Sequence, residues 1–164
     1  MSMSNIRLPE DGNVLLLRAA ATLSSVAATD IITMNDYHKV TFILTVGTAT
    51  TGGNVSVRQM DSVSDTVANE SRLGIDYYWE KTAAAGTSLT KTSADSISSA
   101  GGITVANADD SKMYVFEVMG SQLSSSNDCI ALYFDSSTWN TTLVQVTAIG
   151  HPRYAGATVQ DMLS

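Results

Sequence analysis

Cysteine is almost absent from this 164-residue sequence, which contains a single one, Cys129. One thiol excludes an internal disulfide, so the fold has to be held by an apolar core, and a chain of this length can bury one without cross-links. Because Cys129 lies in an apolar run, we expect a buried and unreactive thiol there and not a nucleophile.

Basic residues are also few and dispersed. Nine Lys and Arg stand against sixteen Asp and Glu, for a formal net charge of −7. Without a basic cluster to release counterions from phosphates, we expect no nucleic-acid binding, and an anionic membrane surface is disfavoured for the same reason. No apolar run approaches the ~18 residues of a membrane span, and no basic segment followed by an apolar one predicts a signal peptide.

Patterns that would indicate a chemical site are missing too. His38 and His151 are far apart in the sequence, neither accompanies a Gly-x-Ser-x-Gly serine, and no metal-ligand spacing includes them. The pair Asp109-Asp110 lacks the spaced acidic pattern of a calcium loop, so we interpret it as a solvated turn. The sequence therefore predicts no enzyme activity, no metal and no cofactor.

The most regular stretch covers residues 37–46. Val40, Phe42, Leu44 and Val46 alternate with a set that is mostly threonine. A period of two with β-branched residues is typical of a strand with one buried face. We therefore predict that this segment is the central strand of a sheet.

Other short apolar or alternating runs predict eight or nine strands in all, with no helix longer than a few turns and at most one helical turn at residues 67–73. This pattern excludes α/β folds, and the absence of paired cysteines around a tryptophan argues against an immunoglobulin domain. The prediction is an all-β antiparallel sandwich, jelly-roll-like, in residues 13–151, between an N-terminal arm (1–12) and a C-terminal tail (152–164). The remaining strands are expected at 14–20, 30–34, 55–60, 75–81, 103–105, 113–119, 129–134 and 142–149.

Two neighbouring pairs of these strands are expected to form hairpins. The first joins residues 37–46 to 55–60, and the second joins 103–105 to 113–119. In the second strand of the latter pair, the even-numbered apolar residues Tyr114, Phe116 and Val118 should face the core. Residues 82–102 are rich in Ala, Ser, Thr and Gly, so we expect a surface excursion there with at most a weak strand at 88–92.

The aromatic residues offer the alternative of carbohydrate binding. In residues 75–81 we expect Trp79 to face the core beside Ile75, and Tyr78 to face solvent. Trp139 lies in a polar loop, where an indole is either folded back over the sandwich edge or buried against a partner. A sugar-binding module would use Trp139 and Tyr78.

A surface dominated by Ser, Thr, Ala and Gly, with a proline in each terminal arm, suggests that the chain lies against neighbours. Proline also predicts that sheet pairing stops at residue 152. We expect contacts with a protein partner from both arms and from the tryptophan of the polar loop. The candidate partner contacts are Leu8, Pro9, Trp139, His151, Pro152, Arg153 and Tyr154.

In overall layout the sequence resembles the head decoration, or cement, proteins of tailed double-stranded DNA bacteriophages. The resemblance lies in the strand at 37–46, the Gly/Ser turn leading into residues 128–134, and the closing strand at 144–149 followed by His-Pro-Arg-Tyr. It implies a non-enzymatic virion protein, made in the host cytoplasm, often trimeric, that binds the major capsid protein on the outer capsid surface and stabilises the shell. An acidic chain agrees with that outward position, since a DNA-filled lumen would repel it.

Two other functions stay open from the sequence. One is another phage virion component, such as a tail, connector or fibre subunit. The other is the carbohydrate-binding sandwich.

Overall fold

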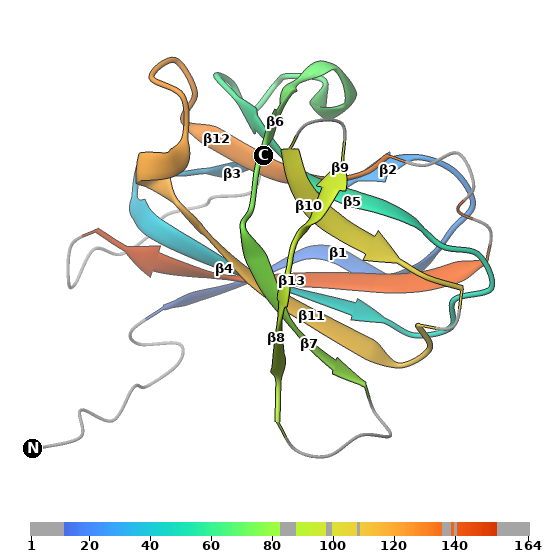
Figure 1. Ribbon diagram of the computed structural model, residues 1–164. Helices are drawn as coiled ribbons and strands as arrows, with labels where there is room; N and C mark the ends of the chain where they lie inside the picture. Colours follow the sequence, from blue (N-terminus) through green and yellow to red (C-terminus); the bar gives the residue numbers. More distant parts are fainter. Residues whose placement is uncertain are drawn as a thin grey trace, which may run out of the picture.

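The computed structural model describes residues 12–82, 88–97, 100–107, 109–135, 139 and 141–153. Within them, thirteen strands form two antiparallel sheets that pack face to face, and the chain also contains two short 3₁₀ helices (Figure 1). Sheet A contains, in spatial order, β1 (Asn13–Leu23), β13 (Thr142–Pro152), β4 (Tyr37–Val46), β11 (Lys112–Met119), β7 (Tyr77–Thr82) and β8 (Thr90–Ser93). Sheet B contains, in spatial order, β2 (Ala27–Ala28), β12 (Cys129–Phe134), β5 (Gly53–Met60), β10 (Ala100–Val105) and β9 (Asp95–Ile97). Two further short strands belong to it: β3 (Ile32–Thr33) pairs with β12, and β6 (Ser71–Leu73) pairs with β5. The two helices are η1 (Val67–Asn69) and η2 (Gly120–Gln122).

The connectivity is that of a jelly roll, as the sequence predicted. Starting in sheet A with β1, the chain crosses to sheet B for β2 and β3, returns for β4, and crosses again for β5. After an insertion that contains β6 to β9, the strands β10, β11, β12 and β13 again alternate between the sheets. The fold is therefore an all-β antiparallel sandwich of the jelly-roll type.

Both predicted hairpins are wrong for the same reason. β4 pairs with β13 and β11, whereas β5 pairs with β12, β10 and β6 in the other sheet. Likewise β10 pairs with β5 and β9, and β11 with β4 and β7. Consecutive strands of a jelly roll lie in opposite sheets, so adjacency in sequence does not produce pairing here.

The central strand is confirmed with its predicted bounds and faces. Val40, Phe42, Leu44 and Val46 of β4 are fully buried between the sheets. The next strand in the sheet contributes Tyr114, Phe116 and Val118 to the same core, as expected, and the rings of Phe42 and Phe116 stack with centroids 5.2 Å apart. These pairs form the centre of one continuous apolar cluster between the two sheets.

The faces of β7 are the reverse of the prediction. Tyr78 is buried and its ring meets Tyr114 edge-on, while Tyr77 is exposed and Trp79 is half-buried on the outer side. Ile75 is buried, but it lies in the crossing between sheets, where its N–H donates to the Gly101 carbonyl of sheet B. The strand begins only at Tyr77, so an alternation counted from Ile75 assigns the wrong face to each aromatic side chain.

Residues 88–97 are also more ordered than a surface excursion. β8 pairs with β7, and after Ala94 the chain continues as β9 and pairs with β10. This ribbon passes from sheet A to sheet B along one edge of the sandwich (Figure 1). It therefore forms the outermost strand of both sheets on that side and joins them.

Candidate functional site

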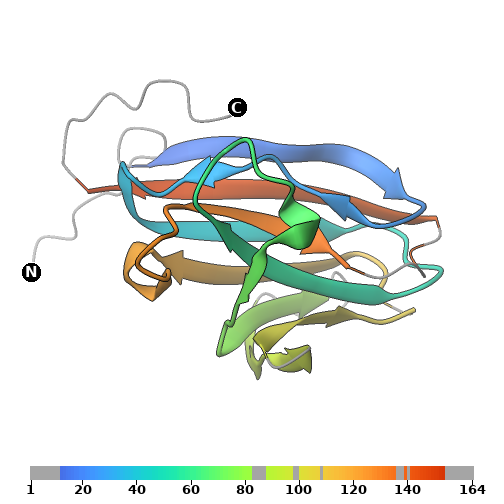
Figure 2. The same cartoon turned by 90° about the horizontal axis from the view of Figure 1, so that it is seen from above.

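The two outer faces of the sandwich differ. On sheet B, the segment between β5 and β6, which contains η1, lies over outward side chains of β5 and β12 (Figure 2), and β6 then pairs with β5 in the sheet. Val67 of η1 packs with Ile31, Met60, Cys129 and Ala131 in a second, smaller core. The outer face of sheet B is therefore covered by the chain itself.

Charged groups under this cover are paired within the chain. Arg58 stacks over the ring of Tyr133 at 4.8 Å, and Arg72 lies 2.7 Å from a carboxylate oxygen of Asp135. Asp135 also accepts a hydrogen bond from Ser56 at 3.1 Å. Of these contacts, the ion pair between Arg72 and Asp135 fastens β6, at the end of the covering segment, to the sheet.

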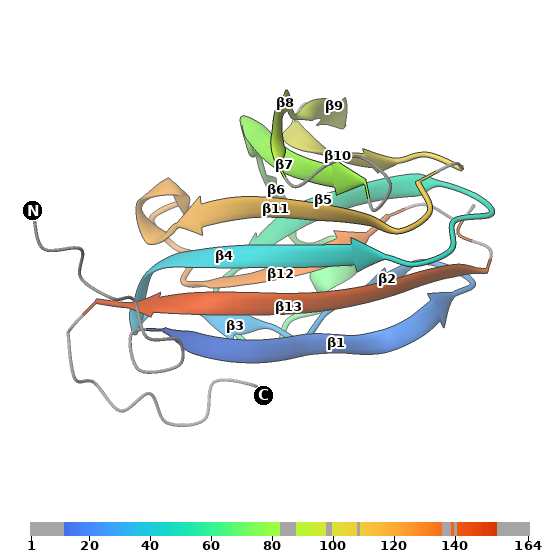
Figure 3. The same cartoon turned by 90° about the horizontal axis from the view of Figure 1, so that it is seen from below.

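The outer face of sheet A carries no second layer from the described residues (Figure 3 shows this sheet in front). A row of directly opposed residues crosses all six strands, and its three central members belong to β4, β11 and β7: Ile43, Val115 and Trp79. The row reads Leu16, Thr147, Ile43, Val115, Trp79 and Lys91. We call this row, with the outward residues that flank it on the same six strands, the docking face.

Large apolar side chains lie exposed on the docking face. Val14 is 54% exposed, Leu16 50% and Met119 50%. Tyr77 and Leu143 are also exposed, at 41% and 38%. Isolated exposed apolar residues need no explanation, but a group on one sheet face indicates an interaction surface.

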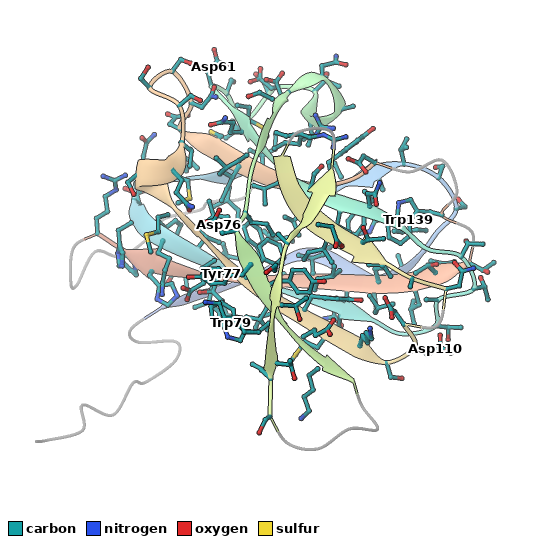
Figure 4. The ribbon with its side chains drawn as sticks, in the orientation of Figure 1. Asp61, Asp76, Tyr77, Trp79, Asp110 and Trp139 are labelled. Atoms are coloured by element: carbon teal, nitrogen blue, oxygen red, sulfur yellow. The ribbon has the colours of Figure 1, made fainter. Side chains whose placement is uncertain are left out.

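Tyr77, Trp79 and Lys91 form the aromatic end of the docking face (Figure 4 labels the two rings side by side). The two rings meet edge-on, with centroids 5.2 Å apart and an interplanar angle of 88°. The Lys91 ammonium lies 3.6 Å from the centroid of Tyr77 and so covers one side of that ring. Perpendicular rings, one of them covered by a cation, do not make a flat platform for a sugar.

A shallow hollow of about 60 Å³ lies beside this end of the face. Its walls combine carboxylates, an amide and apolar groups. A space this small admits one side chain of a partner and is far below the ~300 Å³ of a typical small-molecule pocket. The hollow is lined by Ile75, Asp76, Tyr77, Glu117, Met119 and Gln122.

The two histidines lie where β4 begins and β13 ends, with ring centroids 6.1 Å apart. His151 Nε2 lies 3.0 Å from the hydroxyl of Thr41, and His38 Nδ1 lies 3.0 Å from the Pro152 carbonyl. Lys39 and Glu117 form an ion pair of 2.8 Å on the same face. Burial, with smaller contributions from Lys39 and His38, lowers the pKa of His151 below its usual 6.5, while Glu117 acts in the opposite direction.

This environment predicts acid sensitivity. Since the folded pKa of His151 lies below its unfolded value, the unfolded chain takes up the proton first as the pH falls below 6.5. The free energy of unfolding should therefore decrease from pH 7.5 to pH 5.5, and His151→Gln should reduce that decrease. Urea unfolding of both proteins at the two pH values measures the difference.

A matched variant controls for loss of the imidazole. Lys39→Gln removes a positive charge near His151, so it should raise the pKa of that histidine and also reduce the decrease. Equal pH dependence in all three proteins would contradict this assignment.

Trp139 is not a partner contact. It is 1% exposed, lies in the main core and meets Phe134 edge-on at 5.6 Å. Of the two expectations for its indole, the structure shows the one that folds back into the sandwich. Since Tyr78 is buried as well, the carbohydrate site built on Trp139 and Tyr78 is wrong.

The other predicted contacts have different outcomes. Pairing in β13 ends at Pro152 as expected, with an irregularity between His151 and Pro152. The Arg153 guanidinium donates to the Tyr37 carbonyl at 3.0 Å, so this side chain is engaged within the fold. Of the seven candidates, His151 lies on the docking face. Leu8, Pro9 and Tyr154 lie outside the described residues.

Cys129 is buried, as expected, beneath the cover of sheet B. Burial, and then the neighbouring Asp128, raise the pKa of its thiol to about 12, which disfavours the reactive thiolate. Among the described residues, no three His, Cys, Asp or Glu side chains are grouped so that they could hold a metal ion.

The described part of the chain contains no helix with the length and apolar character needed to cross a membrane.

Comparison with known proteins adds little. No family model and no curated protein matches the sequence. Among solved structures, the chain is similar to the crystal structure of SPBc2 prophage-derived protein YomS, with 11% identity, 85% of this chain and 94% of that chain covered, and a TM-score of 0.43. This degree of similarity supports no transfer of function, so the docking face itself has to carry the functional inference.

Proposed function

We propose that this chain is a structural virion protein, a decoration or cement protein that binds the major capsid protein on the outer surface of the shell and stabilises it. The observation that carries the proposal is the difference between the two sheet faces: one is covered by the chain's own residues, and the other leaves large apolar side chains exposed. A rigid domain with one exposed binding face is suited to binding a partner and not to catalysis.

The side chains of the docking face have the composition of a protein interface. Tyr, Trp and Met are enriched at such interfaces, and this face presents Tyr77, Trp79, Met113 and Met119. Jelly rolls are among the folds used in viral capsids. The net charge of −7 agrees with a position outside the shell, away from packaged DNA.

In this proposal the protein is a homo-oligomer, with a trimer favoured, that is made in the host cytoplasm and ends on the capsid surface. Binding to the assembled shell and not to free shell subunits would stabilise the shell by mass action, so the stabilisation should increase with occupancy.

Removal and addition test the proposal. Shells that lack the protein should release their DNA at a lower temperature than decorated shells, and purified protein should restore the higher temperature. A DNA-binding dye measures release during heating. Equal release temperatures for bare and decorated shells would refute a cement role.

The second candidate, a tail, connector or fibre subunit, differs in stoichiometry. A decoration protein should be present in a copy number comparable to that of the shell subunit, whereas a connector or fibre subunit is present in a small fixed number. Quantitative mass spectrometry of purified particles separates the two.

A further inference from the structure

We propose that the docking face of sheet A binds an acidic protein surface, and that the row from Leu16 to Lys91 is the centre of the contact. This inference rests on the proposed function and names the face and the chemistry of the partner. The partner is the shell subunit, through a patch that combines apolar side chains with Asp or Glu.

Charge is distributed unevenly between the docking face and the rest of the chain. The whole sequence has sixteen acidic and nine basic residues. The docking face carries Lys39, Lys81 and Lys91 against Glu117, and Asp76 lines the hollow beside it. Because Lys39 and Glu117 neutralise each other at 2.8 Å, Lys81 and Lys91 outnumber the remaining carboxylate and leave this face positive on an acidic protein.

The two lysines lie where a partner would meet them. Lys81 is opposite Met113 and Lys91 is opposite Trp79, so each charge adjoins an apolar side chain of the face. Lys91 is already held over the Tyr77 ring, so little side-chain freedom is lost when it pairs with a carboxylate. A carboxylate that approaches the aromatic end would meet a fixed ammonium beside apolar surface.

The dimensions are adequate for a specific contact. The row crosses five gaps between neighbouring strands of about 4.8 Å each, so it is about 24 Å long. Along each strand the face extends over three steps of about 6.8 Å between successive outward residues, which gives an area of roughly 500 Å². That area is more than half of the ~800 Å² that one partner contributes to a standard interface. Several copies on one shell would add their contacts.

The charges on the docking face itself determine the electrostatics of the contact, because salt screens the charges elsewhere on the chain. At physiological ionic strength charges farther than about 8 Å are largely screened, so the acidic residues elsewhere on the chain act weakly at this face. A second copy that presents the same face would place Lys81 and Lys91 against like charges, which disfavours a face-to-face dimer. Two lysines without a wider basic patch are also too few to hold a polyanion.

Binding of the full-length protein to purified bare shells tests the inference. Lys81→Glu/Lys91→Glu should weaken binding by about tenfold or more, since it replaces two attractive charges with two repulsive ones. Leu16→Glu should weaken binding by a similar factor because it puts a charge into the apolar row. Val63→Glu, a change at an exposed apolar residue outside the docking face, is the matched control and should bind like the wild type.

Salt dependence and folding provide the remaining controls. Binding of the wild type should weaken between 50 and 300 mM NaCl more steeply than binding of the double-lysine variant. All variants should unfold within a few degrees of the wild type, since each change is at an exposed or outward side chain.

The outcomes separate this inference from the proposed function. If wild type and face variants bind shells equally, the docking face is wrong and the cement role stands. If the wild type does not bind shells, both the cement role and this inference are wrong. Self-association, or binding to a single-stranded oligonucleotide, that Lys81→Glu/Lys91→Glu abolishes would show another occupant and overturn the inference.

Discussion

Trp139→Ala should lower the free energy of unfolding by about 4 kcal/mol, the usual cost of removing a large aromatic side chain from a well-packed core. Trp139 is 1% exposed and packs edge-on against the buried ring of Phe134. Its loss would leave a cavity that the flanking sheets cannot close without moving the strands. Urea unfolding followed by far-UV circular dichroism measures the change.

The protein contains a matched control, its second tryptophan. Trp79 lies half-buried on the docking face, so Trp79→Ala should cost about 1 kcal/mol or less. Trp139→Phe should be tolerated better than Trp139→Ala, because a phenyl ring refills most of the space and, among the described residues, the indole Nε1 has no hydrogen-bond partner to lose. Similar costs for the two alanine variants would contradict the placement of Trp139 in the core.

Asp109→Asn should lower the free energy of unfolding by about 3 kcal/mol near neutral pH, because the amide nitrogen that replaces one carboxylate oxygen cannot accept from a lysine and so breaks the ion pair of a buried group. Asp109 accepts hydrogen bonds from the Tyr114 hydroxyl at 2.7 Å and from the Ala106 N–H at 2.6 Å. Lys112 Nζ lies 2.6 Å from its other oxygen. Chemical denaturation at pH 7 measures the loss.

The pH profile makes this prediction specific. Burial alone would raise the pKa of Asp109, but the bonds from Lys112, Tyr114 and Ala106 outweigh it and hold the pKa below 3.8. Its contribution to stability is therefore complete above pH 3.8 and is lost as the pH falls through the lower folded value. The gap between wild type and Asp109→Asn should narrow in acid.

The neighbouring acid serves as the control for this variant. Asp110 is exposed and accepts from the Ala49 N–H at 2.6 Å, a bond that an asparagine oxygen can also accept. Asp110→Asn should therefore lower the free energy of unfolding by much less than Asp109→Asn does. If both variants lose the same stability, the buried network around Asp109 does not contribute as described.

Local patterns predicted the strands, because alternation along one strand needs no knowledge of its neighbours. Residues 37–46 show this, since period two gave both the strand and its buried face. The same reasoning failed at Trp79 and Tyr78, where a crossing residue shifted the count. It also failed at Asp109, whose burial depends on a tyrosine and a lysine that the turn brings together.

The docking face could not be predicted from pairs of adjacent strands. It is assembled from β1, β13, β4, β11, β7 and β8, and only the jelly-roll connectivity places these six side by side. A signal was present in the sequence, since Ile43 and Val115 are apolar at outward positions of otherwise alternating strands. What the sequence lacked was the information that these two residues are direct neighbours.

The pairing of β1 with β13 has a practical consequence for engineering. Asn13 lies opposite Gly150, so the chain enters and leaves the sandwich at one pole. Lys81, in the register row of Thr45 and Gln145, lies toward the opposite pole. A peptide or reporter joined directly before Asn13 or directly after Arg153 would start from a single side of the sandwich, which makes this fold a candidate scaffold for displaying cargo.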